Sequence, residues 1–129
     1  MPETQFGLSS IRQIAINTHD LKKAIEYYRD VLGMKFLFEA PGDLAFFDCG
    51  GIRIMLALPD SPEFDHPSSI IYFKVPDIQN AYEVLTSRGV KFAGKPNMIA
   101  RLADHDLWLA EFRDLDNNVL ALMSEVPRA

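Results

Sequence analysis

The apolar positions of this chain follow two periods, and each period predicts one kind of element. A period of 3.6 residues governs Leu21–Leu32, where one helical face carries the side chains of Leu21, Ala24, Ile25 and Tyr28. Asp20 stands before this segment as a predicted N-cap, and Gly33 follows it with the freedom to adopt the left-handed conformation that ends many helices. A period of two residues predicts a strand over Ile11–Asn17.

Three further strands follow the predicted helix and complete a first module at about residues 11–58. Pro41–Asp43 forms a predicted turn, and Gly50–Gly51 forms the predicted turn of a β-hairpin. The strands on either side of these turns are Met34–Ala40, Leu44–Asp48 and Ile52–Leu58. The first module therefore has the order strand, helix and three strands.

The same order returns after a proline-rich linker at about residues 59–69. A second module at about residues 70–123 is predicted from a helix at Ile78–Arg88 and from four strands: Ile70–Val75, Val90–Ala93, Leu107–Arg113 and Val119–Met123. Equivalent positions are 57 residues apart in the first strands but 66 residues apart in the hairpins, so we expect an insertion, as a polar loop, around Gly94–Asp106. The pattern predicts an α+β domain of two tandem βαβββ modules.

Composition and charge narrow the classes of protein that fit this pattern. A length of 129 residues and a hydrophobic content of 48% suffice for one domain spanning residues 1–129. A net charge of −5 with scattered basic residues argues against a nucleic-acid partner, and no apolar run has the roughly 18 residues of a membrane span. The N-terminus lacks the features of a signal peptide, so we expect a cytoplasmic protein. The single cysteine, Cys49, allows no internal disulfide and shows no sign of activation.

Two motifs resemble those of one known family. DLKKAIEYYRDVLGMKF resembles the helix and following Leu-Gly-Met/Phe of the vicinal oxygen chelate superfamily, and FRDLDNNVLAL resembles its F-x-D-P-D-G-N-x-x-E-L signature. This superfamily includes glyoxalase I, bleomycin-resistance proteins and extradiol dioxygenases. Over about residues 11–123 the resemblance implies an open, curled mixed β-sheet barrel with helices outside. The inner faces of such a barrel line a ligand cavity that often holds a divalent metal.

The resemblance also implies where metal ligands would stand. The four family positions fall on Gln13, Met55, Ile70 and Ala121. Strand alternation supports this mapping, because these side chains all lie opposite the positions that are expected to face the helices. Only Gln13 offers an oxygen, whereas divalent cations need several oxygen or imidazole donors. We therefore predict no metal at the usual place.

The remaining inner-face positions predict a largely apolar cavity for a small organic ligand. Its predicted wall consists of Gln13, Ala15, Asn17, Met55, Ile70, Tyr72, Ala121 and Met123. His66 and His105 lie in segments that can overhang the cavity mouth, and Trp108 is a candidate for a stacking wall or a dimer contact. The alternatives are core packing for the two methionines and exposed loop polarity for the two histidines. The amide of Gln13, in a largely apolar space, is expected to need hydrogen-bond partners, which a ligand or an ordered water can supply.

Other polar residues fit structural roles. His19, at the corner between strand and helix, is expected on the surface. The last hairpin carries four aspartates that are expected to form turns and to have solvated side chains, with a catalytic carboxylate pair as the alternative: Asp104, Asp106, Asp114 and Asp116.

Three hypotheses for function follow. The first is a metal-independent protein, similar to bleomycin-resistance proteins, that binds a small organic molecule. The second is a glyoxalase-like lyase or isomerase in which Gln13 and displaced donors, His66, His105 or Glu111, hold Zn, Ni, Mn or Fe. The third is a non-catalytic interaction module. The resemblance further implies a homodimer, since many relatives form one and some complete the cavity across the interface.

Overall fold

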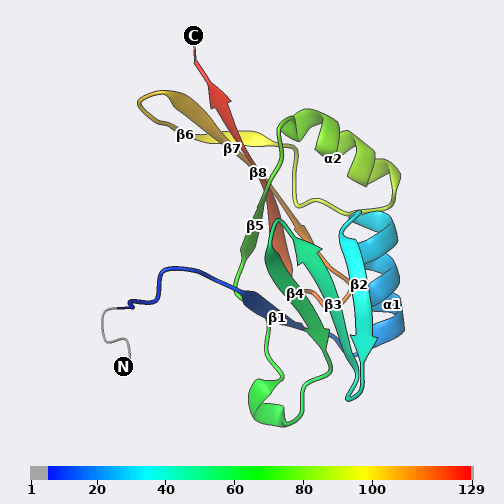
Figure 1. The fold of residues 1–129 in the computed structure, drawn as a ribbon. Helices are drawn as coiled ribbons and strands as arrows, with labels where there is room; N and C mark the ends of the chain where they lie inside the picture. Colours follow the sequence, from blue (N-terminus) through cyan, green and yellow to red (C-terminus); the bar gives the residue numbers. More distant parts are fainter. Residues whose placement is uncertain (1–5, 129) are drawn as a thin grey trace.

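The structure is a computed structural model that describes residues 6–128 (Figure 1). The elements of the first module are β1 (Gln13–Asn17), α1 (Leu21–Glu26), a π-helical continuation η1 (Tyr27–Val31), β2 (Lys35–Ala40), β3 (Leu44–Cys49) and β4 (Ile52–Ala57). The linker carries a short 3-10 turn, η2 (Pro62–Phe64). The elements of the second module are β5 (Ile71–Lys74), α2 (Ile78–Ser87), β6 (Asn97–Arg101), β7 (His105–Arg113) and β8 (Val119–Pro127).

The strands within residues 6–128 form two four-stranded sheets of the same topology, β1-β4-β3-β2 and β5-β8-β7-β6. β1 pairs in parallel with β4, and β5 pairs in parallel with β8. All the other strand pairs are antiparallel. Ile14 lies opposite Ile54, and Ile71 lies opposite Leu120, as the sequence repeat requires. The predicted α+β fold of two tandem βαβββ modules is confirmed.

Both helices begin with the cap that the sequence predicts. The carboxylate of Asp20 accepts a hydrogen bond from the backbone N–H of Lys23 at 3.1 Å, and Asp77 does the same for Asn80 at 3.1 Å. Gly33 follows the first helix with φ of 76°, the left-handed conformation expected there. No helix within residues 6–128 is long and apolar enough to cross a membrane.

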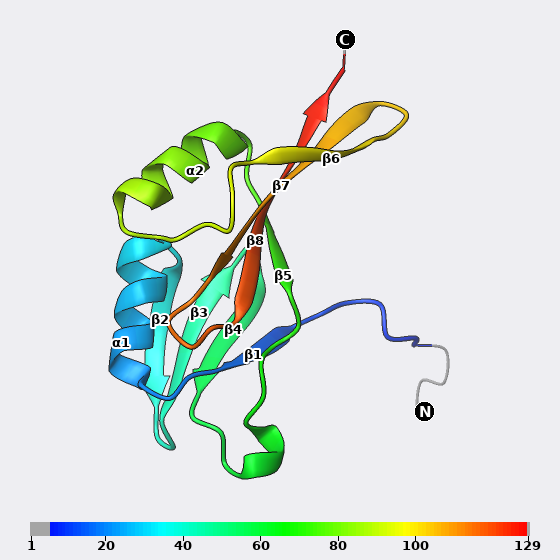
Figure 2. The ribbon, with the colours of Figure 1, turned by 180° about the vertical axis from the view of Figure 1, so that it is seen from behind.

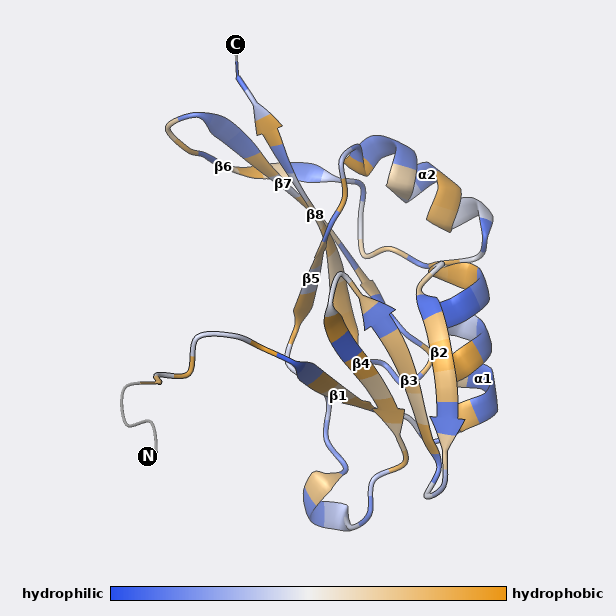
Figure 3. Ribbon diagram, in the orientation of Figure 1, coloured by the Kyte–Doolittle hydropathy of each residue, from blue (hydrophilic) through white to orange (hydrophobic). Residues whose placement is uncertain are grey.

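One hydrophobic core is shared by both modules. α1 packs against β3 and β4, and α2 packs against β7 and β8, with both helices on the same side of the molecule (Figures 1 and 2). The fully buried side chains include Ile16, Phe47, Leu56 and Leu120. Apolar residues are concentrated in the strands that form this core (Figure 3). Burying these apolar side chains removes their surface from water and so stabilises the fold.

The faces of the two sheets that point away from this core are termed the outer faces. They carry the positions, such as Gln13 and Met55, that are expected to line the inside of the barrel. They do not close around a common cavity within one chain. On the second sheet, Ile70 and Tyr72 stay 47% and 49% exposed. The barrel that the family resemblance implies is therefore open in the single chain.

Two expectations for the second module are wrong. The insertion is not only a loop, because Asn97–Arg101 forms strand β6 and pairs with β7. Val90–Ala93 is not a strand and contributes a single bridge, between Phe92 and Phe112. The cause is the following Gly94-Lys95-Pro96 segment, which favours a turn and lacks an N–H donor at Pro96. β7 begins at His105, earlier than predicted, and so gives β6 its partner.

Candidate ligand-binding site

Gln13 lies on the outer face of the first sheet, between two side chains of β4. Its Oε1 accepts a hydrogen bond from Nε of Arg53 at 2.9 Å, and its Nε2 lies 3.7 Å from Sδ of Met55. The guanidinium of Arg53 also lies over the ring of Phe46, 5.2 Å from the ring centre. The Gln13 amide thus has the partners that it is expected to need, and they are neighbouring side chains of β4 and not a ligand or water.

Next to this group the outer face of the first sheet is hollowed. The hollow measures about 260 Å³, and we call it the outer-face hollow. β1 and β4 form its floor, and the linker forms its wall. The residues used below are Ala15, Asn17, Met55, Ala57, Phe64 and His66. Four predicted cavity residues, Ala15, Asn17, Met55 and His66, thus come together here.

Asn17 holds the linker in place over this hollow. Its Nδ2 donates to the carbonyl of Phe64 and, at 3.0 Å, to the carbonyl of His66. From the other module, Oδ1 of Asn118 accepts from the backbone N–H of Ser68 at 3.0 Å. The wall of the outer-face hollow is therefore fixed by two side-chain amides, one from each module.

The side chain of His19 also holds the linker in place. Its Nε2 lies 2.8 Å from Oδ1 of Asp65 in the linker, and its Nδ1 lies 3.1 Å from Oδ1 of Asp116 in the β7–β8 loop. Hydrogen bonds and charge attraction from Asp65 and Asp116 raise the pKa of His19 above its usual value. His19 is exposed, as predicted, but it also bridges the two modules.

The outer face of the second sheet carries the other predicted cavity residues. Tyr72 lies opposite Ala121, and Lys74 lies opposite Met123. Ile70 directly precedes this strand and is half exposed. Ile70, Tyr72, Ala121 and Met123 form a second apolar surface, which the outer-face hollow does not include.

His105 is the first residue of β7. Its Nδ1 donates to Oδ1 of Asp104 at 2.7 Å, and its Nε2 is 3.4 Å from Oε2 of Glu125. The hydrogen bond from His105 lowers the pKa of Asp104. Trp108 packs against the hydrophobic core. The prediction that its ring forms a stacking wall of the cavity is therefore wrong. The position of Trp108 alternates with those of Leu107 and Leu109, which point to the outer face.

The family positions for a metal do not fit a divalent cation in this chain. Gln13 and Met55 lie on the first sheet, whereas Ile70 and Ala121 belong to the second. The single oxygen among them, on Gln13, already faces the positive guanidinium of Arg53. Within residues 6–128 no three His, Cys, Asp or Glu side chains gather where they could hold a metal ion. Within the described residues of one chain, His66, His105 and Glu111 thus do not gather into a set of three such donors.

The aspartates of the FRDLDNN motif shape the last hairpin. Oδ1 of Asp114 accepts from the backbone N–H groups of Asp116 and Asn118, both at 2.9 Å. Oδ2 of Asp114 accepts from Nδ2 of Asn118 at 3.0 Å. The predicted turn-forming role is confirmed for Asp114, but the expectation that such side chains are solvated is wrong here, because Asp114 is only 8% exposed.

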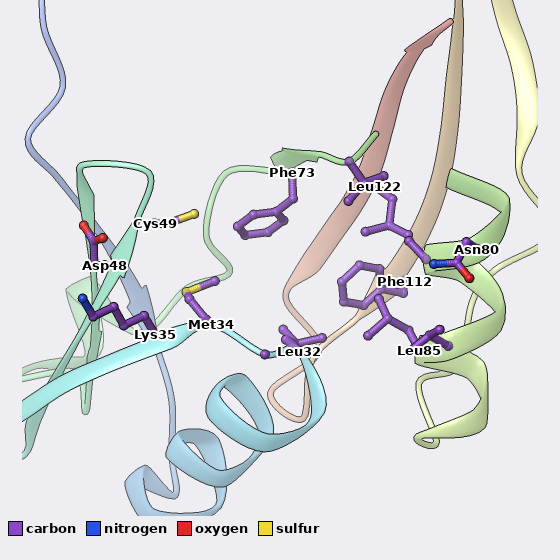
Figure 4. A pocket seen from close by; sticks show the side chains of 14 residues that line it. Leu32, Met34, Lys35, Asp48, Cys49, Phe73, Asn80, Leu85, Phe112 and Leu122 are labelled. Atoms are coloured by element: carbon purple, nitrogen blue, oxygen red, sulfur yellow. The ribbon is translucent and has the colours of Figure 1, made fainter. Parts of the chain in front are cut away.

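A larger hollow lies elsewhere, between the two modules on the core side. It measures about 530 Å³ and is lined by side chains from α2, β5, β7 and β8 and from the first module's β2 and β3 (Figure 4). We call it the inter-module hollow. The hydrophobic pattern of the chain does not predict this hollow, because the pattern of a single element contains no information on a gap between two modules. Cys49 lines it, and burial together with Asp48 raises the pKa of this thiol.

Comparisons with known proteins agree with this architecture. A sequence model of the Glyoxalase/Bleomycin resistance protein/Dioxygenase superfamily matches residues 10–122. The uncharacterized protein YraH of Bacillus subtilis (strain 168) is 31% identical over 126 residues, covering 85% of this chain and 94% of that protein.

Two solved structures share the fold. A member of the same superfamily from Sphaerobacter thermophilus superposes with a TM-score of 0.77 and 26% identity, covering 92% of this chain and 98% of that one. A lactoylglutathione lyase from Agrobacterium tumefaciens superposes with a TM-score of 0.73 and 20% identity, covering 92% of this chain and 95% of that one.

Proposed function

Because the chain belongs to the glyoxalase/bleomycin resistance protein/dioxygenase superfamily, we propose that it binds a small organic molecule on its outer faces without a metal ion. The observation that carries this proposal is the state of Gln13. It is the single oxygen donor among the four family metal positions, and Arg53 occupies that oxygen at 2.9 Å. A divalent cation placed there would meet a guanidinium charge at short range, which opposes its binding.

The lining of the outer-face hollow supports a small organic ligand. Ala15, Met55, Ala57 and Phe64 supply apolar contact, and Asn17 and His66 add polar groups at its edge. A mostly apolar wall with a few polar groups is typical of small-molecule sites. The volume of about 260 Å³ is modest, so one chain alone encloses only part of a larger ligand.

A second copy of the chain would supply the missing wall. The outer faces of the two sheets are both open, and the half-exposed Ile70 and Tyr72 offer an apolar surface that water does not favour. Pairing the first sheet of one copy with the second sheet of another would bring Met55 near Ala121 across the interface. This arrangement is part of the proposal: a homodimer with a ligand site at each of two equivalent interfaces.

Metal analysis and ligand screening test the proposal together. Protein purified without chelator should hold far less than one equivalent of Zn, Ni, Mn or Fe by elemental mass spectrometry. A thermal-shift screen with aromatic and carboxylate-bearing metabolites should identify a compound that stabilises the metal-free protein, by about 2.7 kcal/mol at 100-fold excess over Kd. Stoichiometric metal that is required for this stabilisation would contradict the proposal.

A pair of matched variants locates the site. Ala15→Trp fills the outer-face hollow from an exposed strand position, and it should abolish the thermal shift. Thr86→Trp places the same side chain on an exposed position of α2, outside the hollow, and it should leave the shift unchanged. Sedimentation of the wild-type protein should give the mass of a dimer. A shift that survives in Ala15→Trp would place the ligand elsewhere.

A further inference from the structure

The inter-module hollow is an open, largely apolar groove that the proposed function does not use. It lies on the core side of the sheets, whereas the outer-face hollow lies on the opposite side of the first sheet. Side chains converge on it from both modules: Met34 and Cys49 from the first, Phe73, Leu85, Phe112 and Leu122 from the second (Figure 4). Its volume of about 530 Å³ lies within the usual range of small-molecule pockets, about 300–1,000 Å³.

The apolar side chains that line this groove lie at an opening to solvent, where water does not favour them. Cores are packed as densely as organic crystals, and lining atoms without neighbours lose dispersion contacts. Covering such a groove with an apolar molecule removes its lining from water. A ligand that filled the inter-module hollow would therefore regain contacts that the chain alone leaves unmade.

The lining chemistry specifies an aromatic ligand. Two phenylalanine rings, Phe73 and Phe112, contribute to the wall, and two sulfur atoms, from Met34 and Cys49, lie on the other side (Figure 4). Both ring edges and thioether sulfur make favourable contacts with an aromatic guest. Burial and Asp48 raise the pKa of Cys49, so this thiol stays protonated and serves as an apolar contact.

The charges at the rim favour an uncharged guest. Lys35 and Asp48 both line the hollow, and they lie directly opposite each other on β2 and β3. Their opposite signs leave no net charge that would attract an ionic ligand. Asn80, at the start of α2, supplies an amide that can bond one hydroxyl or carbonyl substituent.

We propose that the inter-module hollow is a second binding site, for an uncharged aromatic compound of one or two rings with a single polar substituent. The ligand would contact both modules at once, so its binding stabilises their packing as well as filling the space. The site is independent of the outer-face hollow, and each is tested by a different variant.

Titration with 1-naphthol tests this site. Isothermal titration calorimetry of the wild-type protein should show saturable binding of one molecule per chain. Val84→Trp projects an indole into the hollow from a partly exposed helix position and should weaken binding at least tenfold. Glu83→Trp, on the exposed neighbouring position that does not line the hollow, and Ala15→Trp, in the outer-face hollow, should leave it unchanged.

A second variant keeps the test decisive if Val84→Trp fails to fold. Asn80→Leu changes an exposed side chain, and it should remove the preference for 1-naphthol over naphthalene. The proposal is overturned if 1-naphthol shows no saturable binding, if both Val84→Trp and Asn80→Leu bind it as the wild type does, or if Ala15→Trp abolishes its binding. It is also overturned if Val84→Trp changes the mass in sedimentation, because a second copy would then occupy the hollow.

Discussion

The hydroxyl of Tyr28 donates a 2.7 Å hydrogen bond to the Asp114 carboxylate, and this contact joins the first module to the second. Both partners lie in the interior, with Tyr28 1% and Asp114 8% exposed. Burial, followed by the charge of Asp114 and this hydrogen bond, raises the pKa of Tyr28, so the phenol stays a donor. The carboxylate that orders the last hairpin therefore also fixes the module interface.

We expect Tyr28→Phe to lower the free energy of unfolding by about 1–3 kcal/mol, because it removes one of the two side-chain donors to Oδ2 of the buried Asp114 carboxylate and leaves Asn118 as the other. Urea denaturation measures this loss. Tyr82→Phe is the matched control, since the Tyr82 ring packs against Phe92 at 4.8 Å and its hydroxyl makes no hydrogen bond within residues 6–128. Equal stability of Tyr28→Phe and the wild type would show that the contact between the modules contributes nothing.

The fold was largely predictable from the sequence, because hydrophobic periodicity is a local signal. The alternation that placed Ile54 and Leu120 in the core is confirmed by their burial, 1% and 0% exposed. The failures come from contacts that no local pattern records. β6 forms because β7 extends backwards to meet it, and Arg53 satisfies Gln13 from the neighbouring strand.

The candidate site was predictable only in part, for the same reason. Strand alternation brought Ala15, Asn17 and Met55 to one face, and they line the outer-face hollow together. It does not say how two sheets are placed relative to each other. The inter-module hollow and the separation of Met55 from Ala121 depend on that placement.

We expect Gly33→Ala to destabilise the protein by about 1–2 kcal/mol, because Gly33 has φ of 76° and a side chain with a Cβ is strained in this conformation. The space around it is not the cause, since the nearest atom to an added Cβ is Nη1 of Arg88 at 3.8 Å. Gly94→Ala is the control: Gly94 has no such φ and no atom near an added Cβ. Thermal unfolding of both variants measures the difference, and equal losses would refute the backbone explanation.

We expect Asn17→Ala to loosen the linker, because it removes both hydrogen bonds from this side chain to the carbonyls of Phe64 and His66. Hydrogen exchange followed by mass spectrometry should show faster exchange in peptides that cover residues 59–69, with little change in β7 and β8. Asn97→Ala, an exposed position on β6, is the control. Unchanged exchange of the linker in Asn17→Ala would mean that other contacts hold it.

His19 gives the stability of the protein a defined dependence on pH. Its pKa is raised in the folded state by Asp65 and Asp116, from the ordinary value of 6.5. Stabilisation from the charged imidazole is therefore fully present below about pH 6.5 and is lost as pH rises through the raised, folded-state pKa. Because His19 is exposed, this stabilisation is also weakened by salt.

We therefore expect His19→Gln to be less stable than the wild type at pH 5.5 and to approach it at pH 9, by thermal unfolding in low salt. His66→Gln is the control, because the His66 ring bonds the carbonyl of Pro67 and not a carboxylate. The double variant Asp65→Asn with Asp116→Asn removes both carboxylates. In that background, His19→Gln should no longer change how the stability of the protein depends on pH. A difference that persists in that background, or that grows as pH rises, would show that these two carboxylates do not hold the His19 charge.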